Sequence, residues 1–297
     1  MSFRLEMVQV ARLAPKLLGE STELVRGFLN SQQNPDGGFK DRTGRSDLYY
    51  TVFGLDALLS LQAEFPLDPV AAYLRSFGDG AALDFVHLCC LARAWAALAN
   101  AGSDLPAMGQ RKTILSRIEA HRADDGGYSV LPGSSVGTVY GSFLALGAYQ
   151  DLKGELPEPL RMVQALKFLE TSDGAWANER TVKTGSTNAS AAAITLLRHL
   201  QAPVNQSVVD WLMARRHGEG GFLAMPNAPI PDLLSTATTL HALAGLQVSL
   251  DPIKESCLDF VDTLWTNEGA FHGHWGDDTV DCEYTFYGLL ALGHLSL

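Results

Sequence analysis

The sequence has few basic residues relative to acidic ones. Its 22 Lys and Arg stand against 33 Asp and Glu, which gives a formal net charge of −11 at pH 7 and an isoelectric point near 5.1. No basic stretch is long enough to offset that negative field, so the chain as a whole repels phosphate backbones. We therefore expect no nucleic-acid partner.

Long hydrophobic runs are also missing: no apolar stretch approaches the ~20 residues that a membrane-spanning helix needs. Residues 1–18 carry Arg4, Arg12 and Lys16 and contain no uninterrupted apolar segment of the kind that marks a secretory signal. We predict a first helix there, no transmembrane segment and a cytoplasmic location.

Cysteine is scarce, and none of the four has the C-x-x-C spacing of metal or redox sites. The neighbours Cys89 and Cys90 are poorly placed to bridge each other, so reduced thiols are the simplest interpretation. The 297-residue chain is 46% hydrophobic and 19% charged, as is ordinary for a globular protein. We predict a single domain over residues 1–297.

An internal repeat is the strongest signal in the sequence. An acidic residue followed by glycine recurs at intervals of 43 to 49 residues, at Asp36-Gly37, Asp79-Gly80, Asp125-Gly126, Asp173-Gly174, Glu219-Gly220 and Glu268-Gly269. Five of the six pairs continue with Gly or Ala and then an aromatic residue, namely Phe39, Tyr128, Trp176, Phe222 and Phe271. A fixed period of this length is typical of a repeat architecture.

Each repeat predicts a helical hairpin. An amphipathic helix, such as residues 23–30, precedes the acidic-Gly pair, and a helix that is apolar nearly all round, such as residues 51–61, follows it. The second helix must be buried on every side, so six hairpins have to stack. The final segment, residues 284–297, is as apolar as the interior helices, which favours closure of the last repeat onto the first. The predicted fold is all-α, a closed toroid.

Three of the apolar helices align without a gap, at residues 47–58, 232–243 and 281–292, and two of them share Tyr-Thr-x-x-Gly-Leu. These helices and the turns before them resemble the repeat of protein prenyltransferase β subunits and class II terpene cyclases such as squalene cyclase. The resemblance implies an α6-α6 toroid with a funnel-shaped, aromatic-lined pocket at the N-termini of its inner helices. It also implies a prenyl diphosphate or other isoprenoid as ligand, and a helical partner subunit.

Two arginines are candidates for the diphosphate site. Arg42 and Arg45 resemble the basic stretch with which the prenyltransferases grip diphosphate, although Arg replaces Lys and the spacing is one residue shorter. Guanidinium groups at a helix N-terminus suit a diphosphate through bidentate hydrogen bonds and the helix dipole. The alternative is a solvated loop in which these arginines balance Asp41 and Asp47.

Only part of the prenyltransferase zinc site is matched in this sequence. In the prenyltransferases an inner helix that begins Asp-x-Cys-Tyr supplies two zinc ligands and the next repeat supplies a histidine. Here Asp47 and His87 match two of those ligands, whereas Tyr49 stands in place of the thiolate and is a poor zinc ligand. A bound zinc ion is therefore one hypothesis, and a histidine hydrogen-bonded within the core is the other.

The last repeat offers different chemistry. Asp281 and Glu283 align with the Asp-x-Asp-Asp-Thr motif of the cyclases, in which the middle acid protonates an alkene, and Tyr284 replaces the third acid. Neighbouring carboxylates raise one another's pKa, so one of them can remain a proton donor. The usual class II cyclase, however, has two domains. A structural alternative is that Asp47, Asp232 and Asp281 cap their helices.

Three functions remain open at this stage. The leading hypothesis is an enzyme that resembles a farnesyl- or geranylgeranyltransferase β subunit, with Asp47 and His87 beside the two arginines. The second is a class II terpene cyclase-like enzyme with Asp281 and Glu283 as its acid. The third is a noncatalytic toroid that binds a lipid or a protein. In each case we expect aromatic residues near the inner-helix N-termini to bind the ligand, in particular Tyr49, Tyr50, Trp275 and Tyr284.

Overall fold

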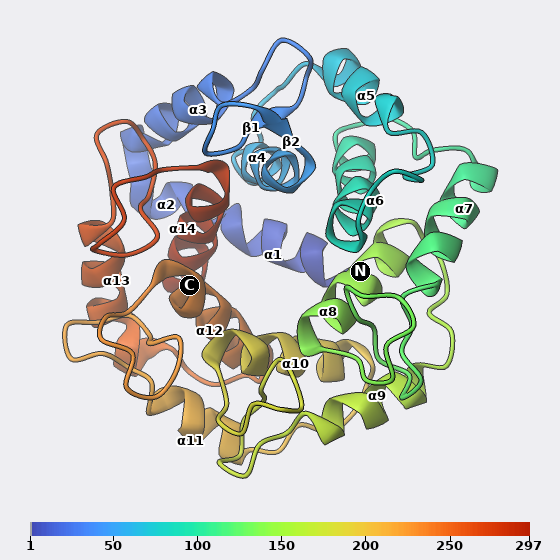
Figure 1. The fold of residues 1–297 in the computed structure, drawn as a ribbon. Helices are drawn as coiled ribbons and strands as arrows, with labels where there is room; N and C mark the ends of the chain where they lie inside the picture. Colours follow the sequence, from blue (N-terminus) through green and yellow to red (C-terminus); the bar gives the residue numbers. More distant parts are fainter. Residues whose placement is uncertain (1) are drawn as a thin grey trace.

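A computed structural model describes residues 2–297 and shows a ring of paired helices (Figure 1). The inner helices are α4 (Leu48–Ser60), α6 (Phe85–Asn100), α8 (Val139–Asp151), α10 (Thr187–His199), α12 (Leu233–Gly245) and α14 (Cys282–Leu295). The outer helices are α3 (Thr22–Ser31), α5 (Leu67–Ser76), α7 (Met108–Glu119), α9 (Pro159–Phe168), α11 (Ser207–Met213) and α13 (Lys254–Thr263). Inner and outer helices alternate along the chain, which confirms the six predicted hairpins.

The ring is closed, because α14 packs against α4 as closely as consecutive inner helices pack against one another (Figure 1). The remaining elements are short: α1 (Phe3–Ala11), α2 (Pro15–Leu18), the 3₁₀ helices η1 (Gly19–Ser21) and η2 (Asp251–Ile253), and a two-stranded antiparallel ladder of β1 (Phe39–Lys40) and β2 (Ser46–Asp47). Within residues 2–297, no helix is long and apolar enough to cross a membrane. The predicted all-α toroid is confirmed.

Every inner helix begins at a polar side chain that accepts a hydrogen bond from the backbone of its first turn. These N-caps are Asp47, Asp84, Thr138, Ser186, Asp232 and Asp281. Such a cap satisfies backbone N–H groups that have no partner inside the helix. The capping alternative considered for Asp47, Asp232 and Asp281 therefore describes one role that each of them has.

In the first and last repeats, the aromatic residue after the acidic-Gly pair packs against a glycine of the inner helix. Phe39 is fully buried, and a Cβ at Gly54 of α4 would lie 2.3 Å from its ring. Phe271 packs in the same way against Gly288 of α14. In the second repeat, which lacks the aromatic residue, the side chain of Leu88 packs against the turn glycine Gly80. The glycines of the inner helices are thus sites of close packing.

The first helix closes one end of the ring. Figure 1 shows α1 crossing the middle of the ring, and its polar side chains pair with residues in the C-terminal halves of inner helices. Arg4 contacts Asp56 of α4 at 2.7 Å and Asp151 of α8 at 3.0 Å, and Glu6 accepts from Arg198 of α10 at 3.0 Å. The N-terminal ends of the inner helices therefore form the open side.

The contact between Phe39 and Gly54 gives a test of this packing. Replacement Gly54→Ala inserts a methyl group into a filled core and should lower the free energy of unfolding by about 1–3 kcal/mol. Gly27→Ala is the matched control, because no atom lies within 4 Å of a Cβ at that position on outer helix α3. It should raise stability by up to about 1 kcal/mol. Equal responses in denaturant titrations would contradict the packing described.

Candidate functional site

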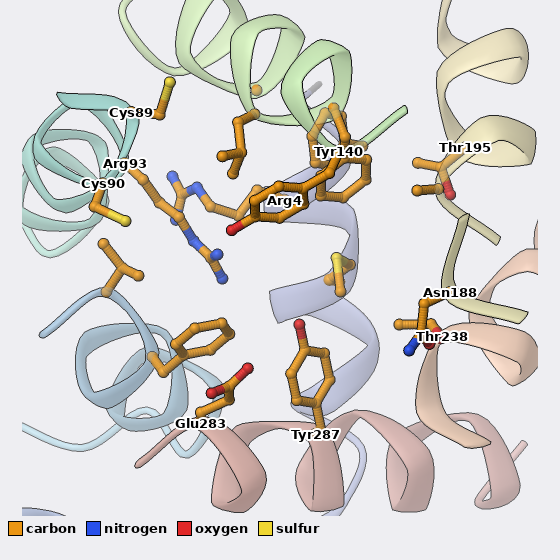
Figure 2. Close-up of a pocket in the computed structure, with 18 of the residues that line it drawn as sticks. Arg4, Cys89, Cys90, Arg93, Tyr140, Asn188, Thr195, Thr238, Glu283 and Tyr287 are labelled. Carbon is orange, nitrogen blue, oxygen red and sulfur yellow. Dashed lines mark hydrogen bonds between the residues drawn. The ribbon is translucent and has the colours of Figure 1, made fainter. Parts of the chain in front are cut away.

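The centre of the ring holds a cavity of about 190 Å³ (Figure 2). Its wall is mostly apolar and includes six aromatic side chains: Phe3, Tyr49, Phe53, Tyr140, Phe143 and Tyr287. A largely apolar cavity with a few polar groups is the usual form of a small-molecule site. The expected aromatic-lined pocket is therefore present, and Tyr49 is one of its lining residues.

The other three predicted aromatic contacts lie outside the lining of this cavity. The ring of Tyr50 packs edge-on against Tyr49, with ring centroids 5.6 Å apart. Trp275 is an exposed loop residue whose indole N–H donates to the Thr263 hydroxyl. The ring of Tyr284 lies under the guanidinium of Arg42. Their roles in binding a ligand stay predictions.

Glu283 is the acidic residue of the last repeat that reaches the cavity. It lies in the first turn of α14, and the Tyr49 hydroxyl donates to its Oε1 at 2.6 Å. Burial raises the pKa of Glu283 to about 7, although the hydrogen bond from Tyr49 acts in the opposite direction. The charge of nearby Asp281 adds to the increase. A large share of Glu283 is consequently protonated near neutral pH.

Asp281 has a different position from its neighbour. Its Oδ1 accepts from the backbone N–H of Tyr284, and its Oδ2 accepts from Nε of Arg42 at 3.0 Å. Burial raises its pKa, while the cap hydrogen bond and Arg42 oppose that shift. Asp281 is absent from the lining of the cavity, so the structure brings it close to Glu283 without giving it access to the same space.

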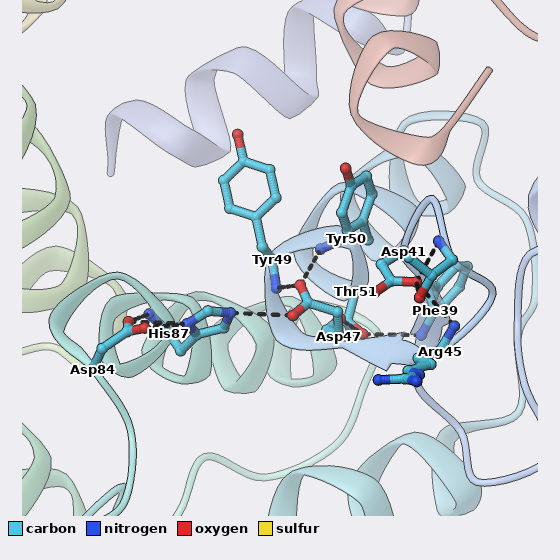
Figure 3. Close-up of polar contacts among 10 residues, drawn as sticks. Phe39, Asp41, Arg45, Asp47, Tyr49, Tyr50, Thr51, Asp84 and His87 are labelled. Carbon is cyan, nitrogen blue, oxygen red and sulfur yellow. Dashed lines mark hydrogen bonds and ion pairs between the residues drawn. The ribbon is translucent and has the colours of Figure 1, made fainter. Parts of the chain in front are cut away.

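The two predicted diphosphate-binding arginines have separate environments. Arg42 bridges the first and last repeats, because it pairs with Asp281 and also with Asp277 at 3.1 Å. Arg45 is exposed on the turn between β1 and β2, and Figure 3 shows its side chain pointing away from Tyr49. Neither arginine lines the cavity.

Asp47 and His87 do meet, as the zinc hypothesis requires. His87 Nε2 lies 3.1 Å from Asp47 Oδ2, and its Nδ1 lies 2.9 Å from Asp84 (Figure 3). The hydrogen bond to Asp47 is the largest of the influences that raise the pKa of His87 to about 9, followed by that to Asp84, while burial opposes them. A protonated imidazole donates from both nitrogens and has no lone pair for a metal ion.

The side chains as placed therefore do not fit a zinc ion. Asp47 Oδ1 caps α4, its Oδ2 binds His87, and Tyr49 in the third position is hydrogen-bonded to Glu283. Residues 2–297 contain no group of three or more His, Cys, Asp or Glu side chains arranged to hold a metal. The zinc ion stays a prediction, which metal analysis of the purified protein can test.

A network of four charged residues was missed in the sequence, and three of them, Arg4, Arg93 and Asp151, line the cavity. Asp56 is fully buried in α4 and binds both Arg93 of α6, at 2.6 Å, and Arg4. Arg4 also binds Asp151, which completes a chain of alternating charges. The sequence did contain a signal for this network, because Asp56 and Arg93 are charged residues inside otherwise apolar helices. A buried charge is costly without a partner, so such residues indicate ion pairs in the core.

The bridge formed by Arg42 should contribute to closure of the ring. Replacement Arg42→Ala removes two charge-assisted hydrogen bonds between the first and last repeats, one of them to the buried Asp281. Because Arg42 itself is 39% exposed, we expect a loss of about 1 kcal/mol in the free energy of unfolding. Arg45→Ala should change it by less than about 0.5 kcal/mol. Denaturant unfolding of both variants measures the difference, and a larger loss for Arg45→Ala would contradict it.

The ion pairs of His87 should make stability depend on pH. The pKa of this group is about 9 in the folded chain against 6.5 as its ordinary value. Its contribution to stability is therefore complete below about pH 6.5 and is lost as the pH rises through about 9. In thermal unfolding, wild type should lose stability over this window relative to His87→Gln. A constant difference between the two proteins would show that His87 is not protonated in this way.

The family of the chain follows from comparison with known proteins. Residues 13–75, 67–223 and 189–296 match the sequence model of the prenyltransferase alpha-alpha toroid domain. Proteins with curated descriptions include no significant match. Among solved structures, a variant of type II terpene cyclase MstE from Scytonema, in complex with geranylgeranyl dihydroxybenzoate, is 14% identical with a TM-score of 0.65. That match covers 95% of this chain and 97% of the other.

The fold is also shared with enzymes that act on sugars. An inactive variant of alpha-1,6-mannanase GH76A of Salegentibacter sp. HEL1_6, in complex with alpha-1,6-mannotriose, is 12% identical with a TM-score of 0.65; the match covers 94% of this chain and 98% of the other. At identities this low, the structural similarity establishes a common fold and gives no information about a common reaction. The match to the family model spans nearly the whole sequence, and on that ground the chain belongs to the prenyltransferase alpha-alpha toroid domain family.

Proposed function

We propose that this chain is a class II terpene cyclase-like enzyme that protonates a double bond of an isoprenoid, with Glu283 as the proton donor. The observation that carries the proposal is a carboxyl group, with its pKa raised to about 7, inside an aromatic cavity. A carboxylic acid held neutral by an apolar site is the state that proton donation requires.

The arrangement of side chains supports each step of such a reaction. The proton of the Glu283 carboxyl would pass to an alkene carbon, forming a C–H bond and leaving a carbocation on the neighbouring carbon. A second double bond would then supply the electron pair for a ring-forming C–C bond. The hydroxyl of Tyr49 already donates to Glu283 and would stabilise the carboxylate left behind. The reaction ends when the last cation loses a proton, or when it adds water and then releases a proton.

The lining of the cavity suits a positively charged intermediate. Tyr49 is hydrogen-bonded to Glu283, and the rings of Phe53 and Tyr287 pack together with centroids 5.5 Å apart in the same lining. The phenol of Tyr287 points into the cavity (Figure 2). Aromatic faces attract a cation through their quadrupole, most strongly where water is excluded. An isoprenoid chain is apolar along its length and would bury that surface against the same walls.

Transfer of a prenyl group from a diphosphate has weaker support. Arg42 is held by two carboxylates, Arg45 is exposed away from the cavity, and both ring nitrogens of His87 are paired with carboxylates, those of Asp47 and Asp84. The length of the chain, by contrast, fits cyclisation. The type II cyclase with a similar fold is matched over almost its whole chain, so a single ring of about this size accommodates that reaction in the relative.

A first experiment separates catalysis from simple lipid binding. Glu283→Gln removes the acidic proton but keeps the shape of the side chain, so we expect cyclised product to disappear while isoprenoid binding persists. Farnesyl and geranylgeranyl compounds serve as probes, with products identified by mass spectrometry. Asp278→Asn is the matched control, because Asp278 is an exposed acid in the loop before α14. Unchanged turnover in Glu283→Gln would refute Glu283 as the donor.

The pH dependence of turnover offers a second test. The active form of Glu283 is the protonated one, so the rate should fall as the pH rises through about 7. Tyr49→Phe removes the hydrogen bond that lowers this pKa, and the fall should move to higher pH by on the order of one unit. The maximum rate should also drop, because the carboxylate product loses its donor. A shift to lower pH would contradict the proposed role of Tyr49.

A further inference from the structure

The cavity wall contains a charged network that the protonation chemistry does not use. Arg93 of α6 donates to Asp56 Oδ2 from Nε at 2.8 Å and lies within 2.6 Å of it through Nη2. Arg4 donates to the other oxygen of Asp56 and to Asp151. Two guanidinium groups and two carboxylates cancel in charge, and all but Arg93 have side chains at most 3% exposed.

Arg93 is the most exposed member of the network, and it lines the cavity together with Arg4 and Asp151. Its side chain is 20% exposed, and its contacts with Asp56 use Nε and Nη2. Figure 2 shows the hydroxyl of Tyr140 directed toward the same region. Tyr140 lines the cavity and is 39% exposed, so its hydroxyl is available to a ligand. Both residues therefore present hydrogen-bond donors to the cavity.

The shape of these donors indicates what would bind them. Asp56 uses the side of the guanidinium formed by Nε and Nη2, which leaves the end formed by Nη1 and Nη2 free. Two parallel N–H groups of that kind match the two oxygens of a carboxylate, and the Tyr140 hydroxyl can donate a third hydrogen bond. A hydrocarbon end would displace water from these donors without replacing its hydrogen bonds.

We infer that Arg93 and Tyr140 bind a carboxylate at one end of the isoprenoid substrate. The isoprenoid part of this statement rests on the proposed function, while the carboxylate part rests on the donors alone. Asp56 and Asp151 pair with the arginines and cancel their charge, so the network has no net positive charge to balance the several negative charges of a diphosphate. Glu283 lies on another wall, on α14 (Figure 2). The anchored carboxylate would thus determine which double bond reaches the acid.

Binding measurements test this inference without turnover. Isothermal titration of the Glu283→Gln protein with geranylgeranoic acid and with its methyl ester compares a carboxylate with a neutral group on the same chain. We expect the acid to bind at least about tenfold more tightly, because the carboxylate accepts hydrogen bonds from a charged group and the ester does not carry the charge. Geranylgeranyl diphosphate, as a third ligand, should bind more weakly than the acid.

Two further variants test whether Arg93 and Tyr140 cause the preference for the acid over the ester. In the same Glu283→Gln background, Arg93→Lys keeps a positive charge beside Asp56 but loses the paired N–H groups. Tyr140→Phe removes only the hydroxyl of a residue that lines the cavity. Both should reduce the preference for the acid. Arg161→Lys, on outer helix α9, is the matched control and should keep it. Circular dichroism spectra check that each variant is folded.

The outcomes distinguish this inference from the proposed function. Equal affinities for acid and ester in the Glu283→Gln protein, or a preference that survives Arg93→Lys, would overturn the carboxylate site and leave the protonation chemistry intact. A clear preference for the acid together with unchanged turnover in Glu283→Gln would support the carboxylate site and overturn Glu283 as the donor. Failure of all three ligands to bind would overturn both.

Discussion

Closure of the ring is the constraint on which the rest of this structure depends. Each inner helix is apolar nearly all round and is stable only when neighbours cover both its flanks. Six hairpins satisfy that requirement when α14 returns to α4. All six inner helices then run in the same direction, with their capped N-termini at the open end and α1 at the other. The cavity is what remains between them.

A closed apolar cavity has opposite effects on the charges that lie in it. Burial raises the pKa of Glu283 to about 7 and so favours the neutral acid. The same burial would make a lone Asp56 or Arg93 costly, and the two are found paired. The low polarity of the cavity thus favours the protonated form of Glu283, whereas Asp56 is stable as a carboxylate because two arginines pair with it.

The local parts of this structure could be predicted from the sequence. The acidic-Gly turns marked six hairpins, the apolar last helix indicated closure, and alignment of inner helices placed Glu283 in the first turn of α14, where it reaches the cavity. These features depend on residues close together in the chain. The proximity of Asp47 and His87 also followed from alignment of adjacent repeats, whereas the contribution of Asp84 to the charge of His87 was missed.

Contacts between distant segments could not be predicted in this way. Arg42 meets Asp281 across 239 positions, and Arg4 meets Asp56 across 52. The closed ring brings these residues together, and no pattern in the sequence relates one to the other. The position of α1 at the base of the cavity has the same origin. A helix with a few polar residues can pack in many places, and only the assembled ring supplies the carboxylates that select this one.

The central claim is that a carboxyl group of this protein transfers its proton to a carbon atom of an isoprenoid. Incubation with geranylgeranoic acid in deuterated water, followed by mass spectrometry and NMR of the product, measures that transfer directly, because the carboxyl proton exchanges with solvent. We predict a cyclic product with one deuterium bound to carbon at the site of initiation. A cyclic product without deuterium, or recovery of the unchanged chain under conditions where the protein transfers a prenyl group from geranylgeranyl diphosphate, would contradict the account.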